Sequence, residues 1–326
     1  MPNVRHHSPE RRVNMTSQAA GEGYSVCVAV CTFRRNDRLA ELVRRINVLA
    51  QHELTDGKVS MVIVDDSPEG GAAATVEALR SQVSLELTYR NTASADISTA
   101  RNCALELAME RSDFVACLDD DCVPDAGWLG ELVQTAEDRA ADIVVGHHLF
   151  FAAAGAPDWL ATEPFLEEKV WYPNGSVPDF GNTANLLIRS DWLLRTRVRF
   201  RSDLGKVGGE DMVFFADARA AGAEIRFAAN SISREPCDGR RATFRYQIWR
   251  QCWLGNNEAV INNTTGAVRS SRLLLRGAKR VGLGLVHPVA RLAQRKSPQW
   301  RWGAGLAGRG AGLLLGVCGL RLRHRS

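Results

Sequence analysis

Short apolar runs alternate with amphipathic stretches along the first third of the chain. Residues 25–31 and 114–118 are continuous apolar runs, which is typical of strands buried on both faces of a sheet. Between the runs, apolar residues recur three and four positions apart, as in helices that cover a sheet. This alternation predicts an α/β fold with a mostly parallel central sheet and helices on both faces. The expected strands are 25–31, 59–64, 85–89 and 114–118, and the expected helices begin near Asn36, Ala73 and Ser98, with Ser98 as a cap.

The pattern becomes less regular after a helix that begins near Trp128. Residues 152–181 are rich in proline and glycine and too long for an ordinary connection, but their aromatic residues argue against disorder. We therefore expect this stretch to form an ordered wall over an active-site cleft. The remaining expected elements are strands over 142–151, 185–188 and 224–229 and a helix over 210–221.

Composition bounds the class of protein. The 326 residues are 45% hydrophobic, enough for one large domain with an appendage. The eight cysteines form no C-x-x-C pair, which favours reduced core thiols of a cytosolic protein. Residues 1–24 are polar without the apolar segment of a secretory signal, so we expect a disordered N-terminal tail. A folded domain over 25–262 and a C-terminal region over 263–326 would follow.

The net charge of +4 hides a strong asymmetry. No acidic residue follows Glu258, whereas 13 lysines and arginines lie between Arg269 and Arg325. Residues 1–258 consequently carry about −9. The sequence predicts an acidic body with a basic C-terminal region.

Three consecutive acids, Asp119, Asp120 and Asp121, end the apolar run 114–118. On an extended backbone, Asp119 and Asp121 would share one face and Asp120 would point to the other. Two carboxylates on one face suit Mg²⁺ or Mn²⁺ bridging to a diphosphate. The alternative is a solvated acidic turn in which Asp125 caps the next helix.

Other polar segments should gather near these acids. In an open parallel sheet the ligand lies outside the carboxyl ends of the strands, where Thr32–Arg35, Asp65–Asp66 and Asp119–Asp121 all fall. The first strand is not followed by G-x-G-x-x-G, which argues against a dinucleotide-binding unit. A nucleotide site of another kind is expected at this edge.

Five ordered segments between Val26 and about Val260 together resemble the family 2 glycosyltransferases of GT-A fold. Within that family the chain looks like the bacterial exopolysaccharide glucosyltransferases of succinoglycan type. The resemblance implies a GT-A domain over residues 25–262. The segments are Val30–Arg35, Val64–Ser67, Ser98–Asn102, Leu118–Pro124 and Gly208–Met212.

The resemblance implies a UDP-sugar as donor. Thr32 and its loop would flank the uracil, although the family often has proline where Cys31 stands. A carboxylate of Asp65 or Asp66 would accept a hydrogen bond from the uracil N3–H group. The donor-binding residues expected from the resemblance are Thr32, Arg34, Asp65, Asp66, Arg101, Asp119 and Asp120. Asp119 and Asp121 would form the D-x-D pair that holds Mn²⁺ or Mg²⁺, with Asp121 the more direct ligand.

The resemblance also assigns the catalytic chemistry. Asp211, next to Glu210, would deprotonate the acceptor hydroxyl as it attacks the anomeric carbon from the face opposite the diphosphate, which inverts that carbon. The metal would neutralise charge on the leaving diphosphate. Spacing alone favours the interpretation of Glu210 and Asp211 as acids that complement the dipole of a helix N-terminus, and the D-x-D segment upstream shifts the prediction to a base.

Three further segments carry open alternatives. Gly181–Asn185 resembles the acceptor side of the family and is equally compatible with an ordinary turn. Gln247, Arg250 and Trp253 resemble an imperfect Q-x-x-R-W element, but a helix that packs on the sheet explains them as well. His147 and His148 are expected to be structural residues of a strand.

The basic C-terminal region contains amphipathic stretches interrupted by arginines and glycines, and neither predicts a transmembrane helix. Such a region suits the anionic inner face of a bacterial membrane, where each Lys or Arg contributes about 1 kcal/mol. A disordered basic tail is the alternative. Because no nucleic-acid-binding module is recognisable, no nucleic-acid partner is expected.

The sequence therefore predicts an inverting, metal-dependent hexosyltransferase at the cytoplasmic membrane face, acting on a lipid-linked glycan in exopolysaccharide or cell-surface polysaccharide synthesis. Two alternatives are a sugar-nucleotide pyrophosphorylase and a non-catalytic sugar-nucleotide-binding protein of related fold. A pyrophosphorylase should carry a glycine-rich loop after its first strand, and residues 31–37 contain no glycine.

Overall fold

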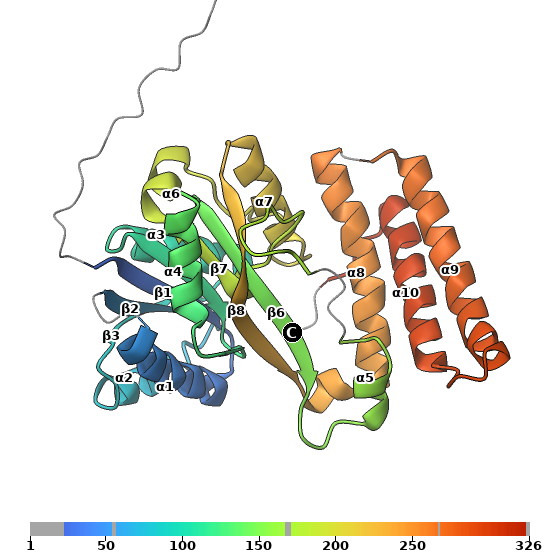
Figure 1. Ribbon diagram of the computed structural model, residues 1–326, viewed down its shortest axis with the longest axis horizontal. Coiled ribbons are helices and arrows are strands. Elements are labelled where there is room, and N and C mark those ends of the chain that lie inside the picture. Colours follow the sequence, from blue (N-terminus) through green and yellow to red (C-terminus); the bar gives the residue numbers. More distant parts are fainter. Residues whose placement is uncertain (1–22, 54–56, 167–170, 267, 324–326) are drawn as a thin grey trace, which may run out of the picture.

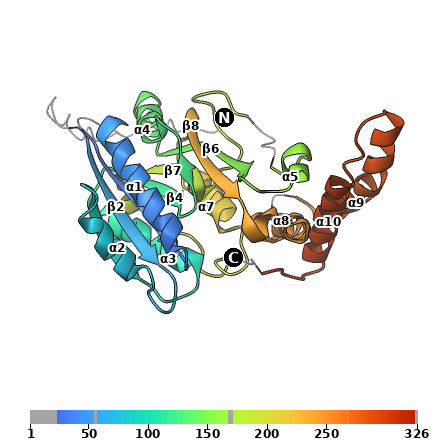
Figure 2. The same ribbon diagram turned by 90° about the horizontal axis from the view of Figure 1, so that it is seen from below.

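The computed structural model describes residues 23–53, 57–166, 171–266 and 268–323 (Figure 1). The predicted N-terminal tail lies almost entirely outside the described residues. A mixed sheet with helices on both faces occupies one end of the molecule, and three long helices occupy the other (Figures 1 and 2).

The described residues form one eight-stranded sheet in the order β3-β2-β1-β4-β7-β6-β8-β5. Strands β3, β2, β1 and β4 run parallel, and the antiparallel β7 joins this half to the pair β6 and β8. The strands are β1 (Ser25–Thr32), β2 (Lys58–Asp65), β3 (Glu86–Asn91), β4 (Phe114–Asp119), β5 (Val123–Pro124), β6 (Ile143–Ala152), β7 (Leu186–Arg189) and β8 (Ile225–Cys237).

Two hydrophobic cores lie on opposite faces of the sheet. Alternate residues of β1 enter different cores, because successive side chains of a strand point to opposite faces: Val28 joins one core and Ala29 the other. Helices α1 (Asn36–Glu53), α2 (Ala73–Arg80) and α4 (Trp128–Asp138) cover the first face. Helices α3 (Ile97–Met109), α6 (Ser190–Thr196) and α7 (Glu210–Ala220) cover the second. The predicted α/β architecture is confirmed.

Two expected boundaries are wrong. Helix α3 begins at Ile97, and its cap is Asp96, whose carboxylate accepts a hydrogen bond from the backbone N–H of Thr99 at 3.0 Å, whereas the predicted cap Ser98 is buried in the first turn. Strand β8 continues to Cys237 instead of ending at Ala229, after an irregularity opposite Gly146 and His147. This extension carries additional polar side chains toward the site.

The basic C-terminal region folds into helices. Helices α9 (Ser270–Ala293) and α10 (Trp300–Val317) of this region pack side by side with α8 (Phe244–Thr265), which begins before it, and α9 is outermost (Figure 1). The short helix α5 (Asp158–Thr162) adjoins this unit through the cluster of Leu160, Phe165 and Trp302. No helix in the described ranges has the length and apolar character needed to cross a membrane.

Glycines allow these helices to approach closely. A Cβ atom on Gly312 of α10 would lie 1.8 Å from the carbonyl oxygen of Cys252 in α8, and one on Gly255 would lie 1.9 Å from that of Arg309. A Cβ on Gly284 of α9 would similarly meet the carbonyl oxygen of Gly303 at 2.4 Å. Because side chains at these positions would force the helices apart, α8, α9 and α10 form a tightly packed unit.

Candidate functional site

A cavity of about 700 Å³ lies at the carboxyl ends of β1 and β4 and extends to α7 and α8. This volume is typical of small-molecule sites. Most of the residues predicted for donor binding, metal binding and catalysis line it. They are Thr32, Asp66, Arg101, Asp119, Asp120, Asp121, Glu210 and Asp211.

Arg34 and Asp65 are the two predicted site residues that do not line the cavity. The side chain of Arg34 is 60% exposed and pairs with Glu69. The carboxylate of Asp65 accepts hydrogen bonds from the backbone N–H groups of Ser67 and Ala72, both at 2.9 Å. Asp65 thus stabilises the turn that leads into α2.

Asp66 differs from its neighbour. Its Oδ1 accepts hydrogen bonds from the hydroxyl groups of Thr92, at 2.8 Å, and Ser94, at 2.5 Å. Asp66 is 4% exposed and lies in the cavity wall. Of the two adjacent acids, Asp66 is therefore the one that can reach a ligand.

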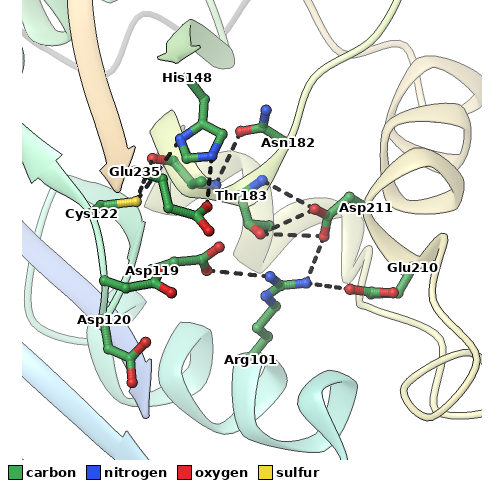
Figure 3. A network of polar contacts seen from close by, with 12 residues as sticks. Arg101, Asp119, Asp120, Cys122, His148, Asn182, Thr183, Glu210, Asp211 and Glu235 are labelled. Carbon is green, nitrogen blue, oxygen red and sulfur yellow. Dashed lines mark hydrogen bonds and ion pairs between the residues drawn. The ribbon is translucent and has the colours of Figure 1, made fainter. Parts of the chain in front are cut away.

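Arg101 connects the two acidic segments of the site (Figure 3). Its Nη1 donates hydrogen bonds to Glu210 Oε1 and Asp211 Oδ1, both at 2.6 Å, and its Nη2 lies 3.4 Å from Asp119 Oδ1. Burial opposes the charge of Arg101, but the nearby carboxylates, Asp211 first, outweigh burial and raise its pKa. The resemblance implies that Arg101 contacts the nucleotide, and the structure places its side chain against the predicted base.

The carboxylates of Glu210 and Asp211 are held in different ways. The Thr183 hydroxyl lies 3.2 Å from Asp211 Oδ2, and the Thr183 backbone N–H lies 3.4 Å from the same atom. Glu210 Oε2 is buried, and among the described residues none donates a hydrogen bond to it. Burial, followed by the charge of Asp211, raises the pKa of Glu210 to about 7, and burial raises the pKa of Asp211 against the opposing charge of Arg101. The pair can therefore take up a proton near neutral pH.

The structure contradicts the prediction that Asp119 and Asp121 share one face while Asp120 points to the other. Strand β4 ends at Asp119, and the backbone turns there, with the N–H of Cys122 donating to the Asp119 carbonyl oxygen at 3.1 Å. Arg35 Nη1 donates to both Asp120 Oδ1 and Asp121 Oδ2 at 2.8 Å, so these two acids share a partner. Asp119 pairs with Arg101 instead. The alternation of side chains applies only to the extended backbone, which stops at Asp119.

Thr32 and Asp120 contact each other directly. The Thr32 hydroxyl donates to Asp120 Oδ2 at 2.7 Å, and both side chains are buried. Burial raises the pKa of Asp120, with the charge of Arg35 opposing it. The first loop and the aspartate cluster are therefore one connected structure.

Asp121 belongs to a second charged cluster that includes Arg241, Glu235 and His148. Arg241 Nη1 lies 2.9 Å from Asp121 Oδ2 and also pairs with Glu235, whose other oxygen lies 3.0 Å from His148 Nε2. Burial, together with the charge of Glu235, raises the pKa of Asp121 to about 6. His148 was expected to be structural, but it lines the cavity.

Sequence reasoning missed Arg35, Arg241 and Glu235 as site residues. Glu235 escaped because β8 was expected to end at Ala229. The sequence carries no apolar alternation there, because the buried positions Ser231, Ser233 and Glu235 are polar, and the apolar Ile232 lies at a less buried position. The position of Glu235 near the aspartates therefore became apparent only from the observed length of β8.

The segment Gly181–Asn185 adjoins the predicted base. Asn182 and Ala184 line the cavity, and Thr183 contacts Asp211. Asn185 is buried, accepts a hydrogen bond from Trp128 Nε1 at 2.9 Å and donates one to the His147 carbonyl oxygen of β6 at 2.8 Å. The segment therefore both borders the site and anchors it to the sheet.

The C-terminal helices reach the cavity through α8. Gln247, Arg250 and Trp253 line it; Arg250 lies over the ring of Phe150 at 4.4 Å, and Trp253 Nε1 donates to the Val207 carbonyl oxygen at 3.0 Å. By contrast, of the described residues in 152–181, only Leu166 lines the cavity. The prediction that residues 152–181 form a wall of the active-site cleft is therefore wrong for most of that stretch. Its aromatic residues pack away from the cavity, for example Phe165 on Trp302 with ring centroids 5.2 Å apart.

The aspartate oxygens fit a divalent cation if a bound ligand supplies further oxygens. Carboxylate oxygens are the ligands that Mg²⁺ and Mn²⁺ prefer. In the part of the chain that the structure describes, however, no group of three or more His, Cys, Asp and Glu side chains could hold a metal ion by itself. An ion at Asp119 and Asp121 would need further oxygens from a bound diphosphate and water, as is usual for Mg²⁺.

Comparisons with known proteins agree with this geometry. The sequence profile of glycosyl transferase family 2 matches residues 27–195. The chain is 30% identical over 260 residues to the succinoglycan biosynthesis protein ExoM of Rhizobium meliloti (strain 1021), covering 79% of this chain and 82% of that protein. It is also 30% identical over 255 residues to the glucosyl-dolichyl phosphate glucuronosyltransferase of Haloferax volcanii, covering 73% and 77%.

Solved structures support the same fold. The mannosyltransferase PcManGT from Pyrobaculum calidifontis matches with a TM-score of 0.59 and 16% identity, covering 94% of this chain and 90% of that one. Residues 1–349 of Staphylococcus aureus TarS match with a TM-score of 0.51 and 14% identity, covering 91% and 92%. The family match sets aside the pyrophosphorylase alternative. The chain belongs to glycosyl transferase family 2 and is a glycosyltransferase of GT-A fold.

Proposed function

We propose that this enzyme transfers a hexose from a UDP-sugar to a hydroxyl group of a lipid-linked glycan, with inversion at the anomeric carbon and with Mn²⁺ or Mg²⁺ bound. The product would be a glycan extended for exopolysaccharide or cell-surface polysaccharide, released together with UDP and one proton. Asp211 accepts that proton from the attacking hydroxyl.

The environment of Asp211 is the observation that carries this proposal. Its carboxylate lies in the cavity wall, fixed by Arg101 on one side and by Thr183 on the other. Burial raises its pKa, which makes it a better base toward a hydroxyl group than a solvated aspartate. Because Arg101 also contacts Asp119, the base is positioned relative to the segment proposed to hold the diphosphate.

The nucleotide end of the cavity supports a uridine donor. Asp66 has one oxygen held by two hydroxyl groups, and its other oxygen could accept a hydrogen bond from the uracil N3–H while Thr32 and its loop flank the ring. TarS has been crystallised with UDP and UDP-GlcNAc, whereas PcManGT was crystallised with GDP-mannose and Mn²⁺. The choice of base is therefore part of the test.

Asp119 and Asp121 would hold the metal ion together with the donor diphosphate. When bound, the ion supplies positive charge that stabilises the departing diphosphate. Arg35 and Arg241, which pair with Asp121 in this structure, lie close enough to contribute further positive charge at the same place.

The acceptor and location follow from the relatives and from the charge. ExoM is named for succinoglycan biosynthesis, and the Haloferax enzyme is named for a glucosyl-dolichyl phosphate acceptor, which is lipid-linked. The 13 basic residues after Glu258, with no acidic residue, suit an anionic membrane surface. We place the enzyme in the cytoplasm, peripheral on the inner face of the plasma membrane.

Release of free nucleotide from a panel of UDP- and GDP-sugars would test the donor and the metal together. The purified enzyme would be assayed with Mn²⁺ or Mg²⁺ and with a chelator. Slow donor hydrolysis without acceptor is sufficient for detection. We expect metal-dependent release of UDP from one sugar donor and loss of this release in Asp121→Asn.

The matched control is Asp203→Asn, since Asp203 is an exposed acid that pairs with Arg201 outside the cavity lining. It should retain the wild-type rate. Release that is unchanged by the chelator and by Asp121→Asn would contradict the metal assignment, and release of GDP in place of UDP would contradict the nucleotide assignment.

A further inference from the structure

The outermost helix, α9, exposes an apolar face. Leu275 is 72% exposed, Leu285 70% and Val289 66%, and four more large apolar residues of the same helix are at least 41% exposed. Single exposed apolar residues are normal on a protein surface, but a contiguous group marks an interaction site. In both views α9 lies at the end of the molecule away from the sheet (Figures 1 and 2).

Helix geometry places these residues opposite the inner packing surface. Leu273, Gly277 and Gly284 are the buried positions of α9, and Gly277 and Gly284 pack against α10. Leu275 and Val289 are two full heptads apart, so they lie on one face, about half a turn from the buried positions. The outward apolar face of α9 consists of Leu274, Leu275, Leu285, Val286, Val289 and Leu292, whereas Leu283 is exposed on the far side of Arg272 and Lys279.

Positive charge borders this outward face. Arg272 and Lys279 are exposed on α9, whereas Arg276 and Arg280 turn toward α8 and pair with Glu258. An apolar face flanked by basic residues is the pattern of a helix that lies in the interface of an anionic bilayer. Contact with a second copy of α9 would instead bring like charges together, because residues 259–326 contain no acidic residue.

We propose that the outward face of α9 inserts into the surface of a bilayer that contains anionic lipids, with Leu275, Leu285 and Val289 below the headgroups and Arg272 and Lys279 at the level of the phosphates. The inference deepens the proposed function and rests on it for its purpose, which is access to a lipid-linked acceptor.

The packing of the three helices connects this face to the active site. Gly284 brings α9 against α10, and Gly312 brings α10 against α8. Helix α8 in turn supplies Gln247, Arg250 and Trp253 to the cavity wall. Because these contacts leave no room for a Cβ atom, the position of α9 on the bilayer would fix the position of the cavity relative to the membrane.

Flotation of the full-length protein with vesicles tests the proposal. The vesicles would contain phosphatidylcholine alone or phosphatidylcholine with phosphatidylglycerol in equal amounts. The test variant replaces Leu275, Leu285 and Val289 with serine, and a charge variant combines Arg272→Gln with Lys279→Gln. The matched controls are Val48→Ser with Leu194→Ser, two exposed apolar residues of the catalytic body, and Lys58→Gln.

We expect the wild type and the controls to bind the anionic vesicles. Burying one leucine side chain changes a partition coefficient by about tenfold or more, so the serine variant should bind at least tenfold more weakly. Each basic residue near an anionic surface accounts for about fivefold, so the charge variant should bind the anionic vesicles about 25-fold more weakly, and the wild type should bind them more weakly at high salt. Wild-type binding by the serine variant would overturn the proposal.

Two further measurements separate the possible failures. Nucleotide release from the donor, without acceptor or vesicles, should be equal in the wild type and the serine variant, because the outward face of α9 is remote from the cavity lining. Donor cleavage without vesicle binding would refute the membrane role alone, and vesicle binding without donor cleavage would refute the proposed function alone. A wild-type dimer that the serine substitutions convert to a monomer, without vesicle binding, would identify a second copy as the occupant and overturn the inference.

Discussion

Replacing Arg101 with glutamine removes the cation that Glu210, Asp211 and Asp119 share. In the wild type, one guanidinium nitrogen lies 2.6 Å from a carboxylate oxygen of both Glu210 and Asp211, and the other lies 3.4 Å from Asp119. Glutamine can donate a hydrogen bond but carries no charge. The variant would therefore leave adjacent buried carboxylates without compensation.

The size of the effect follows from these contacts. Leaving a buried charge without its partner costs about 3–5 kcal/mol. Proton uptake relieves this cost, and one pKa unit corresponds to about 1.4 kcal/mol, so the acid pair should bind its proton about 2 to 4 units more tightly. The pKa of Glu210 is already raised to about 7. At neutral pH, about 1% or less of the variant would then have both carboxylates ionised.

The assay is the pH dependence of kcat/KM for nucleotide release. Since a base must be unprotonated to accept a proton, activity is lost below its apparent pKa. A raised pKa moves this acid limb to higher pH. We expect Arg101→Gln to be at least about a hundredfold slower than the wild type near pH 7, with the difference narrowing as the pH rises through about 9 to 11.

Arg101→Lys is the matched control, because it retains the charge and loses the forked geometry. Its acid limb should stay close to that of the wild type even if its maximal rate falls. An Arg101→Gln profile with the wild-type acid limb and only a lower plateau would refute the electrostatic reasoning. It would assign Arg101 to ligand contact alone.

Three other predictions use stability and binding. Gly312→Ala should lower the free energy of unfolding in urea by about 1–3 kcal/mol, because its Cβ would overlap α8. Gly282→Ala should raise it by up to about 1 kcal/mol, because a Cβ there would meet no neighbour within 4 Å among the described residues, and equal effects of the two variants would contradict the close helix packing. Asp65→Ala should lower the free energy of unfolding by about 1–3 kcal/mol with little change in UDP affinity, because Asp65 holds a turn. Asp66→Ala should weaken UDP binding in calorimetry, and the reverse result would exchange the roles of the two acids. The pKa of Glu210 is raised from 4.5 to about 7 in the folded state, so protonation of Glu210 stabilises the fold at low pH, and this contribution is lost as the pH rises through 7. Urea titrations should show that the free energy of unfolding falls less between pH 5 and pH 8 for Glu210→Gln than for the wild type.

Local patterns predicted most of the sheet and the grouping of the polar segments. Runs such as 114–118 are buried on both faces and are therefore apolar throughout, so the strands can be recognised from the local sequence alone. Parallel strands then bring their carboxyl ends to one edge, which is why Thr32, Asp66 and Asp119 line one cavity. The position of these residues followed from topology alone.

The contacts within the site could not be predicted in the same way. The direction of Asp120 and Asp121 depends on where β4 stops, and a single residue of further extension would have changed it. Arg241 and Asp121 are separated by more than a hundred residues, and their pairing depends on the length of β8 and on the turn that follows it. Ion pairs of this kind have no local signature.

The C-terminal helices show a different limit. Glycines interrupt the apolar pattern of residues 303–320, and helix propensity disfavours them. Their function becomes clear only with the partner present, since Gly312 faces the backbone of α8 and Gly303 faces that of α9. A row of glycines in an otherwise helical pattern was the available signal for close helix contact.

The comparison of Asp211→Asn with the wild type tests the central claim most directly, by measuring kcat for transfer and the affinity for UDP in the same preparations. Asparagine keeps the shape of the side chain and its contact with Thr183 but cannot accept a proton. The account predicts a loss of about 10² to 10⁴ in kcat with UDP affinity retained. A variant that turns over like the wild type would contradict the role of Asp211 as the base, and a wild type that binds UDP but transfers no sugar from any donor would contradict the proposed transfer itself.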